Sequence, residues 1–133
     1  MNNFQDKFDK GVEELKAGNF DKSLSIFNAL VKAEPANGDF WSERGVVYFH
    51  VGKKKESLAD MDEAVRLQPL KPYRYSSRAY IRAHFKLTQE AIQDYEKAIE
   101  LDPEDAIAQN NLGMLQEQLG YKKEAKQRFD IAD

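Results

Sequence analysis

The chain has 133 residues, of which 41% are hydrophobic and 32% charged, enough apolar material for one modest core or a row of small ones. Twenty basic and 23 acidic residues give a formal net charge of -3, so we expect no binding to nucleic acid and no general attraction to anionic membranes. The lack of cysteine excludes disulfide scaffolds, and without a signal region or long apolar run we predict a cytoplasmic protein with no membrane insertion.

Apolar residues recur at helical spacing along the chain, and turn signals interrupt them at regular places. Pro35, Pro69 and Pro103 are 34 residues apart, and each follows a helical segment that a proline cannot continue. Glycines at 18, 52 and 120 mark further breaks between these prolines. We therefore predict eight helices, at residues 4–17, 20–33, 38–51, 54–67, 72–85, 88–101, 106–119 and 122–132.

Alignment on the prolines produces columns of similar residues without any gap. Small residues form one column, where two helices must approach closely: Gly11, Gly45, Ala79 and Gly113. Large apolar residues that would fill the gap form another: Phe27, Met61, Tyr95 and Phe129. We predict an all-α fold, a solenoid that forms a single domain over residues 1–133, with four helix-turn-helix repeats at about 4–37, 38–71, 72–105 and 106–133.

The chain resembles the tetratricopeptide repeat (TPR) family over residues 4–132. The motifs that carry the resemblance recur in register: Trp41-x2-Arg44-Gly45-x2-Tyr48, Ala91-x3-Tyr95-x2-Ala98 and Leu112-Gly113, with a proline every 34 residues. The resemblance implies a right-handed superhelix whose concave groove is lined by the first helix of each pair. It implies no single activity.

By this resemblance the first helices would present a stripe of partly apolar groove residues. A groove with aromatic anchors suits a peptide or a helix of a partner protein. Alternatively, these side chains pack against one another between adjacent repeats, and the sequence leaves both interpretations open. The candidate groove residues are Phe8, Val12, Asp39, Ser42, Val46, Phe49, His50, Tyr73, Ser76, Tyr80, His84, Ile107, Asn110 and Met114.

Some members of this family bind the C-terminal carboxylate of a heat-shock chaperone. They bind it through lysine and arginine, which supply positive charge, and through asparagine, which supplies amide donors. The matching positions here hold Phe8, Val12, Glu43, Tyr73 and Ser77. A shift by one repeat gives Ser42, Val46, Ser77, Ile107 and Asn111. Neither set fits, and Glu43 would repel an acid, so the sequence disfavours a chaperone tail as the ligand.

Arginine and aspartate occur together 16 residues apart, as Arg44 with Asp60 and Arg78 with Asp94. This pattern predicts an ion pair between the two helices of a repeat. Of the basic row on the predicted fifth helix, Arg74, Arg82 and Lys86 then remain as candidates for contact with a partner.

The other polar clusters favour ordinary structural roles. His50 and His84 occupy equivalent places in successive repeats, too far apart to share one metal ion, and no cysteine accompanies them. Lys53–Lys55 fits a solvated turn. Without a phosphate-binding glycine loop or a catalytic triad motif, we expect no enzyme activity, no metal and no cofactor.

The sequence therefore predicts a non-enzymatic protein-protein interaction scaffold whose concave groove binds a peptide or helix of another protein. The alternative is a self-assembling structural unit that forms a homo-oligomer through its C-terminal repeat. In that hypothesis Phe129 and Ile131 lie on an apolar surface that no further helix covers.

Overall fold

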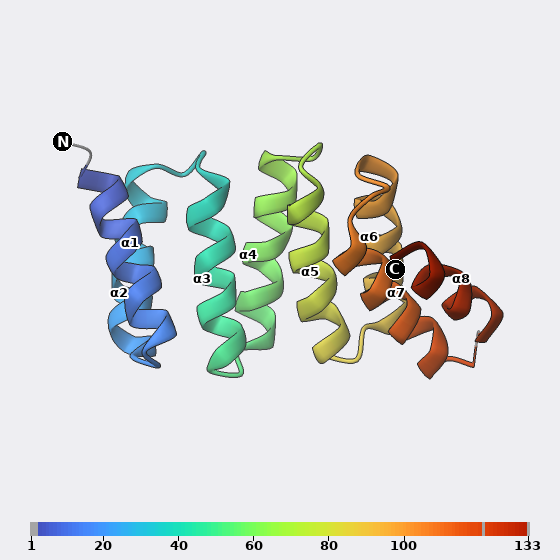
Figure 1. Ribbon diagram of the computed structural model, residues 1–133. Helices are drawn as coiled ribbons and strands as arrows, with labels where there is room; N and C mark the ends of the chain where they lie inside the picture. Colours follow the sequence, from blue (N-terminus) through green and yellow to red (C-terminus); the bar gives the residue numbers. More distant parts are fainter. Residues whose placement is uncertain (1–2, 121, 133) are drawn as a thin grey trace. The chain divides into compact units, whose positions relative to one another are not determined.

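The computed structural model describes residues 3–120 and 122–132, and within these ranges it contains eight helices and no strand. Every helix boundary lies within one residue of its predicted position, which confirms the all-α helical-repeat fold. The helices are α1 (Asn3–Lys16), α2 (Phe20–Ala33), α3 (Gly38–His50), α4 (Lys54–Leu67), α5 (Pro72–His84), α6 (Thr88–Leu101), α7 (Ala106–Gln118) and α8 (Lys122–Ala132) (Figure 1).

The helix ends follow from local backbone chemistry. The Asn37 side chain accepts a hydrogen bond from the Asp39 amide at 3.0 Å, and the Asp105 side chain accepts one from the Ala108 amide at 3.1 Å. Three of the four turns within repeats use a glycine in the left-handed region, with φ between 79° and 85°. In the third repeat Lys86 takes this place with φ 68°, a conformation that is strained for a residue with a side chain.

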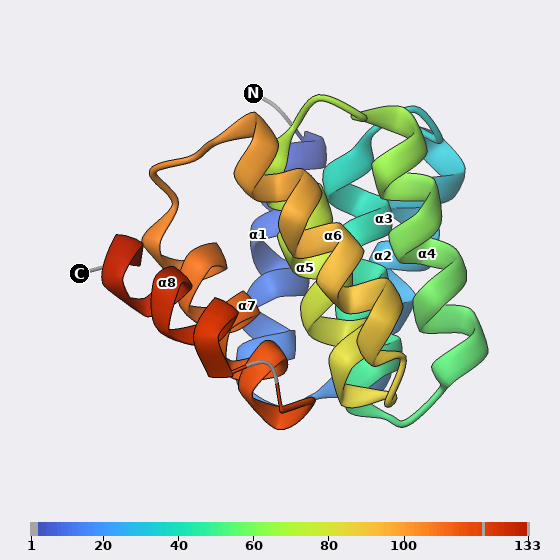
Figure 2. The same cartoon turned by 90° about the vertical axis from the view of Figure 1, so that its right-hand side faces the viewer.

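The chain forms two compact units, one ending at Gln68 and the other beginning at Pro69. Unit 1 contains α1–α4 and unit 2 contains α5–α8. In each unit the two hairpins contact each other through the second helix of one and the first helix of the next, α2 with α3 and α6 with α7 (Figures 1 and 2). The organisation of residues 1–133 as a single domain stays a prediction.

The two helices of each repeat pack closely because a small residue faces a large one. A Cβ atom built on Gly11 would lie 2.8 Å from the Phe27 Cζ atom, closer than real Cβ contacts allow. The same construction on Gly45 meets the Met61 Sδ atom at 2.7 Å. Phe27 and Met61 are fully buried. The predicted small and large columns therefore form the contact between helices.

Side chains on the first helices also hold the segments between repeats. The Trp41 Nε1 atom donates to the Pro35 carbonyl at 2.8 Å, and the Tyr75 hydroxyl donates to the Pro69 carbonyl at 2.7 Å. The Gln109 Nε2 atom donates to the Pro103 carbonyl at 3.3 Å. Three different residue types thus supply a donor six residues after the boundary proline, and each holds the proline carbonyl against the helix that follows it.

The predicted bridges between helices are present. Arg44 binds Asp60 through two hydrogen bonds of 2.8 Å, and Arg78 binds Asp94 through bonds of 2.9 and 2.8 Å. Both aspartates are buried. Because carboxylates lose hydration when buried, the pKa of Asp60 is raised, although the Arg44 guanidinium opposes this shift.

The view of Arg74 and Arg82 as residues available to a partner was wrong. The Arg82 Nη1 atom contacts the Asp94 carboxylate at 2.9 Å, so two arginines share this one acid. Arg74 is among the most buried side chains of the described residues. Burial against neighbouring groups, which no sequence spacing indicates, places both arginines in the structural framework.

Replacing Arg44 by Met should lower the free energy of unfolding by about 3–5 kcal/mol near neutral pH, because the buried Asp60 carboxylate loses its partner. The folded-state pKa of Asp60 lies above its ordinary value of 3.8. Removal of the Arg44 guanidinium, which opposes this shift, raises the folded-state pKa further. Protonation of Asp60 then relieves the unpaired buried charge, so the loss should shrink as the pH falls toward the folded-state pKa of the variant. Urea denaturation across pH measures this effect.

Two control variants accompany this experiment. The double variant Arg44→Met, Asp60→Leu should recover most of the loss, because it leaves no buried charge. Arg66→Met removes an exposed ion pair with Glu63 and should cost below about 1 kcal/mol. A double variant no more stable than Arg44→Met would contradict the assigned role of the pair.

Tyr75→Phe should cost about 1 kcal/mol of stability, because it removes only the hydroxyl that donates to the Pro69 carbonyl. Tyr73→Phe removes an exposed hydroxyl from the same helix and should change stability by less than about 0.5 kcal/mol. Equal effects of the two variants in urea denaturation would show that the boundary hydrogen bond is unimportant.

Candidate functional site

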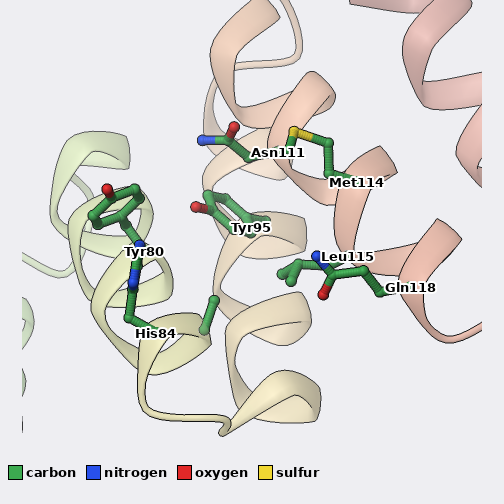
Figure 3. Close-up of a pocket in the computed structure, with 8 residues that line it drawn as sticks. Tyr80, His84, Tyr95, Asn111, Met114, Leu115 and Gln118 are labelled. Carbon is green, nitrogen blue, oxygen red and sulfur yellow. The ribbon is translucent and has the colours of Figure 1, made fainter.

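Unit 2 contains an open cavity of about 230 Å³ between α5, α6 and α7 (Figure 3). Helix α5 supplies one wall, α7 supplies the opposite wall, and a tyrosine of α6 lies between them. The lining residues are Tyr80, Ala83, His84, Tyr95, Asn111, Met114, Leu115 and Gln118. Three of them, Tyr80, His84 and Met114, were predicted from the sequence as groove residues.

Helical spacing brings the wall residues together in pairs. Tyr80 and His84 are one turn apart on α5, and their ring centroids lie 4.6 Å apart at an interplanar angle of 50°. Met114 and Gln118 have the same spacing on α7. Each wall therefore combines an apolar surface with a polar group, the imidazole of His84 on α5 and the amide of Gln118 on α7.

Tyr95 lies deep in this site, with 2% of its surface exposed. Burial raises the pKa of its hydroxyl to about 12, although a hydrogen bond with the Asn111 side chain acts in the opposite direction. The hydroxyl therefore stays protonated at physiological pH. Figure 3 shows it directed toward the space beside Tyr80, close to the Asn111 amide. The deep part of the cavity thus presents neutral hydrogen-bonding groups.

An exposed apolar stripe accompanies the cavity in unit 2. Tyr73 and Tyr80 are seven residues apart on α5, and Ile107 and Met114 are seven apart on α7, so each pair lies on one helix face. These four side chains are between 50% and 73% exposed. The exposed Asn110 amide contacts the Met114 sulfur at 3.9 Å. Ser76, also predicted for the groove, is only partly exposed.

The candidate residues of unit 1 have different surroundings. Phe8 packs against Phe27 and Phe40 with ring centroids 5.9 and 5.7 Å apart, and Val12 packs against the same core cluster. Ser42 is buried, Val46 and Phe49 are half-buried, and Asp39 is exposed. The exposed His50 ring stacks on Phe20 at 5.5 Å. Several of these side chains therefore contribute to packing within unit 1.

Sequence reasoning missed Tyr95, Leu115 and Gln118 and used Asn111 only to argue against a chaperone tail. Tyr95 was assigned to the column that fills the gap between paired helices. A signal was present, because the other members of that column are Phe27, Met61 and Phe129, which have no hydroxyl. A hydroxyl on only one member of this column, Tyr95, indicates that the buried ring of that repeat reaches a polar site.

The part of the chain that the structure describes has neither a candidate metal site nor a candidate membrane span. No group of three or more histidine, cysteine, aspartate or glutamate side chains there could hold a metal ion. None of the helices in residues 3–120 and 122–132 is long and apolar enough to cross a membrane.

Solved structures with similar folds cover most of the chain. A crystal structure of MamA has a TM-score of 0.87 at 20% identity and covers 98% of this chain and 77% of that chain, which indicates the shared fold alone. The first TPR domain of human RPAP3 has a TM-score of 0.81 at 28% identity, with 90% and 94% covered. The first TPR of Spaghetti (RPAP3), bound to the HSP90 peptide SRMEEVD, has a TM-score of 0.80 at 27% identity, with 88% and 93% covered.

Sequence comparisons agree with this structural similarity. No curated protein sequence matches the chain. A family model described as tetratricopeptide repeat matches residues 8–72, and one described as TPR repeat matches residues 88–120. Together with the 34-residue period and the paired helices, these matches show that the chain belongs to the tetratricopeptide repeat family.

Proposed function

We propose that this protein is a non-enzymatic interaction scaffold that binds a segment of a partner protein, and that in unit 2 the segment lies across α5 and α7. The observation that carries the proposal is the exposed apolar stripe beside an open cavity. Helices of a folded protein normally turn large apolar side chains inward, and an exposed patch of them marks an interaction site. The cavity would hold one anchoring side chain of that segment.

The partner segment should differ from the peptide bound by the Spaghetti (RPAP3) domain. That peptide, SRMEEVD, contains three acidic residues. In unit 2 the positions that would need cations for such a tail hold Tyr73 and Ser77, and the lining residues within the described part of the chain include no lysine or arginine. In unit 1, Phe8 and Val12 pack against the core. We therefore propose a largely uncharged segment, either extended or helical.

The proposal extends to the first helices of unit 1. There the exposed Asp39 and His50 and the half-buried Val46 and Phe49 would offer surface to a partner. Phe8 and Val12 are also half-buried but pack against the core cluster, so together with the buried Ser42 they would act mainly by holding α1 and α3 in place.

Self-assembly through the C-terminal repeat has less support. A Cβ atom built on Gly113 would lie 2.7 Å from the Phe129 ring, so Phe129 packs against α7 inside unit 2. Among the described side chains of α8, Ile131 is the large apolar one that is exposed. One exposed side chain is a small apolar area for a stable interface.

Tyr80→Ala should weaken binding of peptides selected from a random display library by about 30-fold or more, the effect expected when an aromatic anchor is truncated. Isothermal titration calorimetry of the selected peptides with the wild-type and variant proteins measures this change. Because Tyr80 is exposed, the melting temperature should stay within about 3 °C of the wild type.

Leu70→Ala is the matched control, since Leu70 is an exposed apolar residue of unit 2 outside the cavity and the stripe. It should change the affinity less than about threefold. Selected peptides that bind Tyr80→Ala as tightly as wild type would overturn the proposed site.

A further inference from the structure

We infer that the unit 2 cavity selects an aromatic side chain that ends in a hydrogen-bonding group, such as the phenol of tyrosine or the indole of tryptophan. The inference rests on the proposed function, because the aromatic side chain belongs to the partner segment. It goes further by naming the chemistry that the cavity recognises. Size, wall chemistry, deep polar groups and charge each support it.

The cavity has room for an aromatic ring. Its volume is about 230 Å³, whereas an engineered protein cavity of about 150 Å³ is large enough to bind benzene. The difference leaves space for a hydroxyl or for the second ring of an indole. A single methyl or isopropyl group would fill this space poorly and would lose dispersion contacts with the walls.

The walls suit an aromatic guest. The Tyr80 and His84 rings lie together on α5, where their edges and faces could pack against a third ring. The Met114 side chain projects from the α7 wall, and a thioether sulfur makes favourable contacts with aromatic rings (Figure 3). Tyr80 and Met114 are both about half exposed, so an incoming ring would remove apolar surface from water on both sides.

The deep part of the cavity favours a polar tip on that ring. The Tyr95 hydroxyl is protonated, and the Asn111 side chain that it contacts has two donors and an acceptor, more than one hydrogen bond uses. The Gln118 amide lies on the same α7 wall. A guest with a hydroxyl or an indole N–H can pair with these groups, whereas a purely apolar ring would displace water from them without replacing its hydrogen bonds.

The lining disfavours a guest that carries a carboxylate or an ammonium group. Among the residues that the structure describes, no lysine or arginine lines the cavity to hold a carboxylate, and no aspartate or glutamate lines it to hold an ammonium group. Asp94, the acid next to Tyr95 in sequence, is paired with Arg78 and Arg82. A charged side chain would therefore lose hydration in the cavity without gaining a partner of opposite charge.

The polar site is specific to unit 2 among the described repeats. The residues 68 positions before Tyr95 and Asn111 are Phe27 and Glu43. Unit 1 thus has a phenyl ring in place of the phenol and a carboxylate in place of the amide. If packing within the repeat required this pair, unit 1 would have it too. The presence of Tyr95 and Asn111 in unit 2 alone therefore points to a role beyond packing.

Side-chain analogues test the inference directly in the whole protein, with binding followed by the amide NMR signals of α5, α6 and α7. The probes are p-cresol for tyrosine, 3-methylindole for tryptophan, toluene for phenylalanine and propionate for glutamate. We expect p-cresol and 3-methylindole to shift the signals of residues around the cavity and to bind about threefold to tenfold more tightly than toluene. Propionate should cause no saturable shift.

Tyr95→Phe removes only the deep hydroxyl and should abolish the preference for p-cresol over toluene while keeping toluene binding. Tyr75→Phe is the control, because it removes a hydroxyl from α5 that bonds the Pro69 carbonyl outside the cavity. Its preference should equal that of the wild type. If Tyr95→Phe unfolds, Asn111→Ala serves as the second variant, and its preference for p-cresol should also fall.

The two proposals fail in different ways. Equal affinity for toluene and p-cresol, or tighter binding of propionate, would overturn the inference about the aromatic guest, even if selected peptides still depend on Tyr80. Selected peptides that ignore Tyr80→Ala would instead overturn the proposed function. Selected peptides that share a tyrosine or tryptophan and need the Tyr95 hydroxyl would support both.

Discussion

Close approach of the two helices in each repeat is the constraint on which the remaining structure depends. Gly11 and Gly45 leave room for Phe27 and Met61, and a side chain at either glycine would collide with its partner. The close contact also brings Arg44 within reach of Asp60, so the buried ion pair follows from the packing. Neither helix of a pair could bury its apolar face alone, and the hairpin is therefore the unit that repeats.

The first helix of a repeat keeps one face exposed, because packing between the paired helices and between neighbouring repeats buries only its other faces. In unit 2 the second helix α6 contributes Tyr95 to the cavity from behind, while α5 and α7 supply walls that face outward. The same column that fills the core elsewhere thus reaches a polar site in this repeat. Under the proposed function, packing and recognition would share this one residue, and such a difference between repeats would let one architecture bind different partners.

The 34-residue period predicted the helices and the phase of the repeats, because proline, glycine and column residues act locally or between paired helices. Which first-helix residues are open to a partner could not be predicted. Phe8 is covered by Phe27 and Phe40, which come from two other helices. Arg82 was misassigned because the 16-residue spacing pairs Asp94 with Arg78 alone. In the structure Asp94 accepts hydrogen bonds from both Arg78 and Arg82. The Tyr95 site depends on three helices meeting, a feature that no single repeat contains.

In the proposed function, unit 2 binds a partner segment across the outward faces of α5 and α7. Mapping the amide NMR signals of the whole protein during titration with one library-selected peptide tests it most directly. The largest shifts should lie along the Tyr73–Tyr80 face of α5 and the Ile107–Met114 face of α7. Shifts concentrated instead on the exposed surface of α6 or α8, with α5 and α7 unchanged, would contradict it.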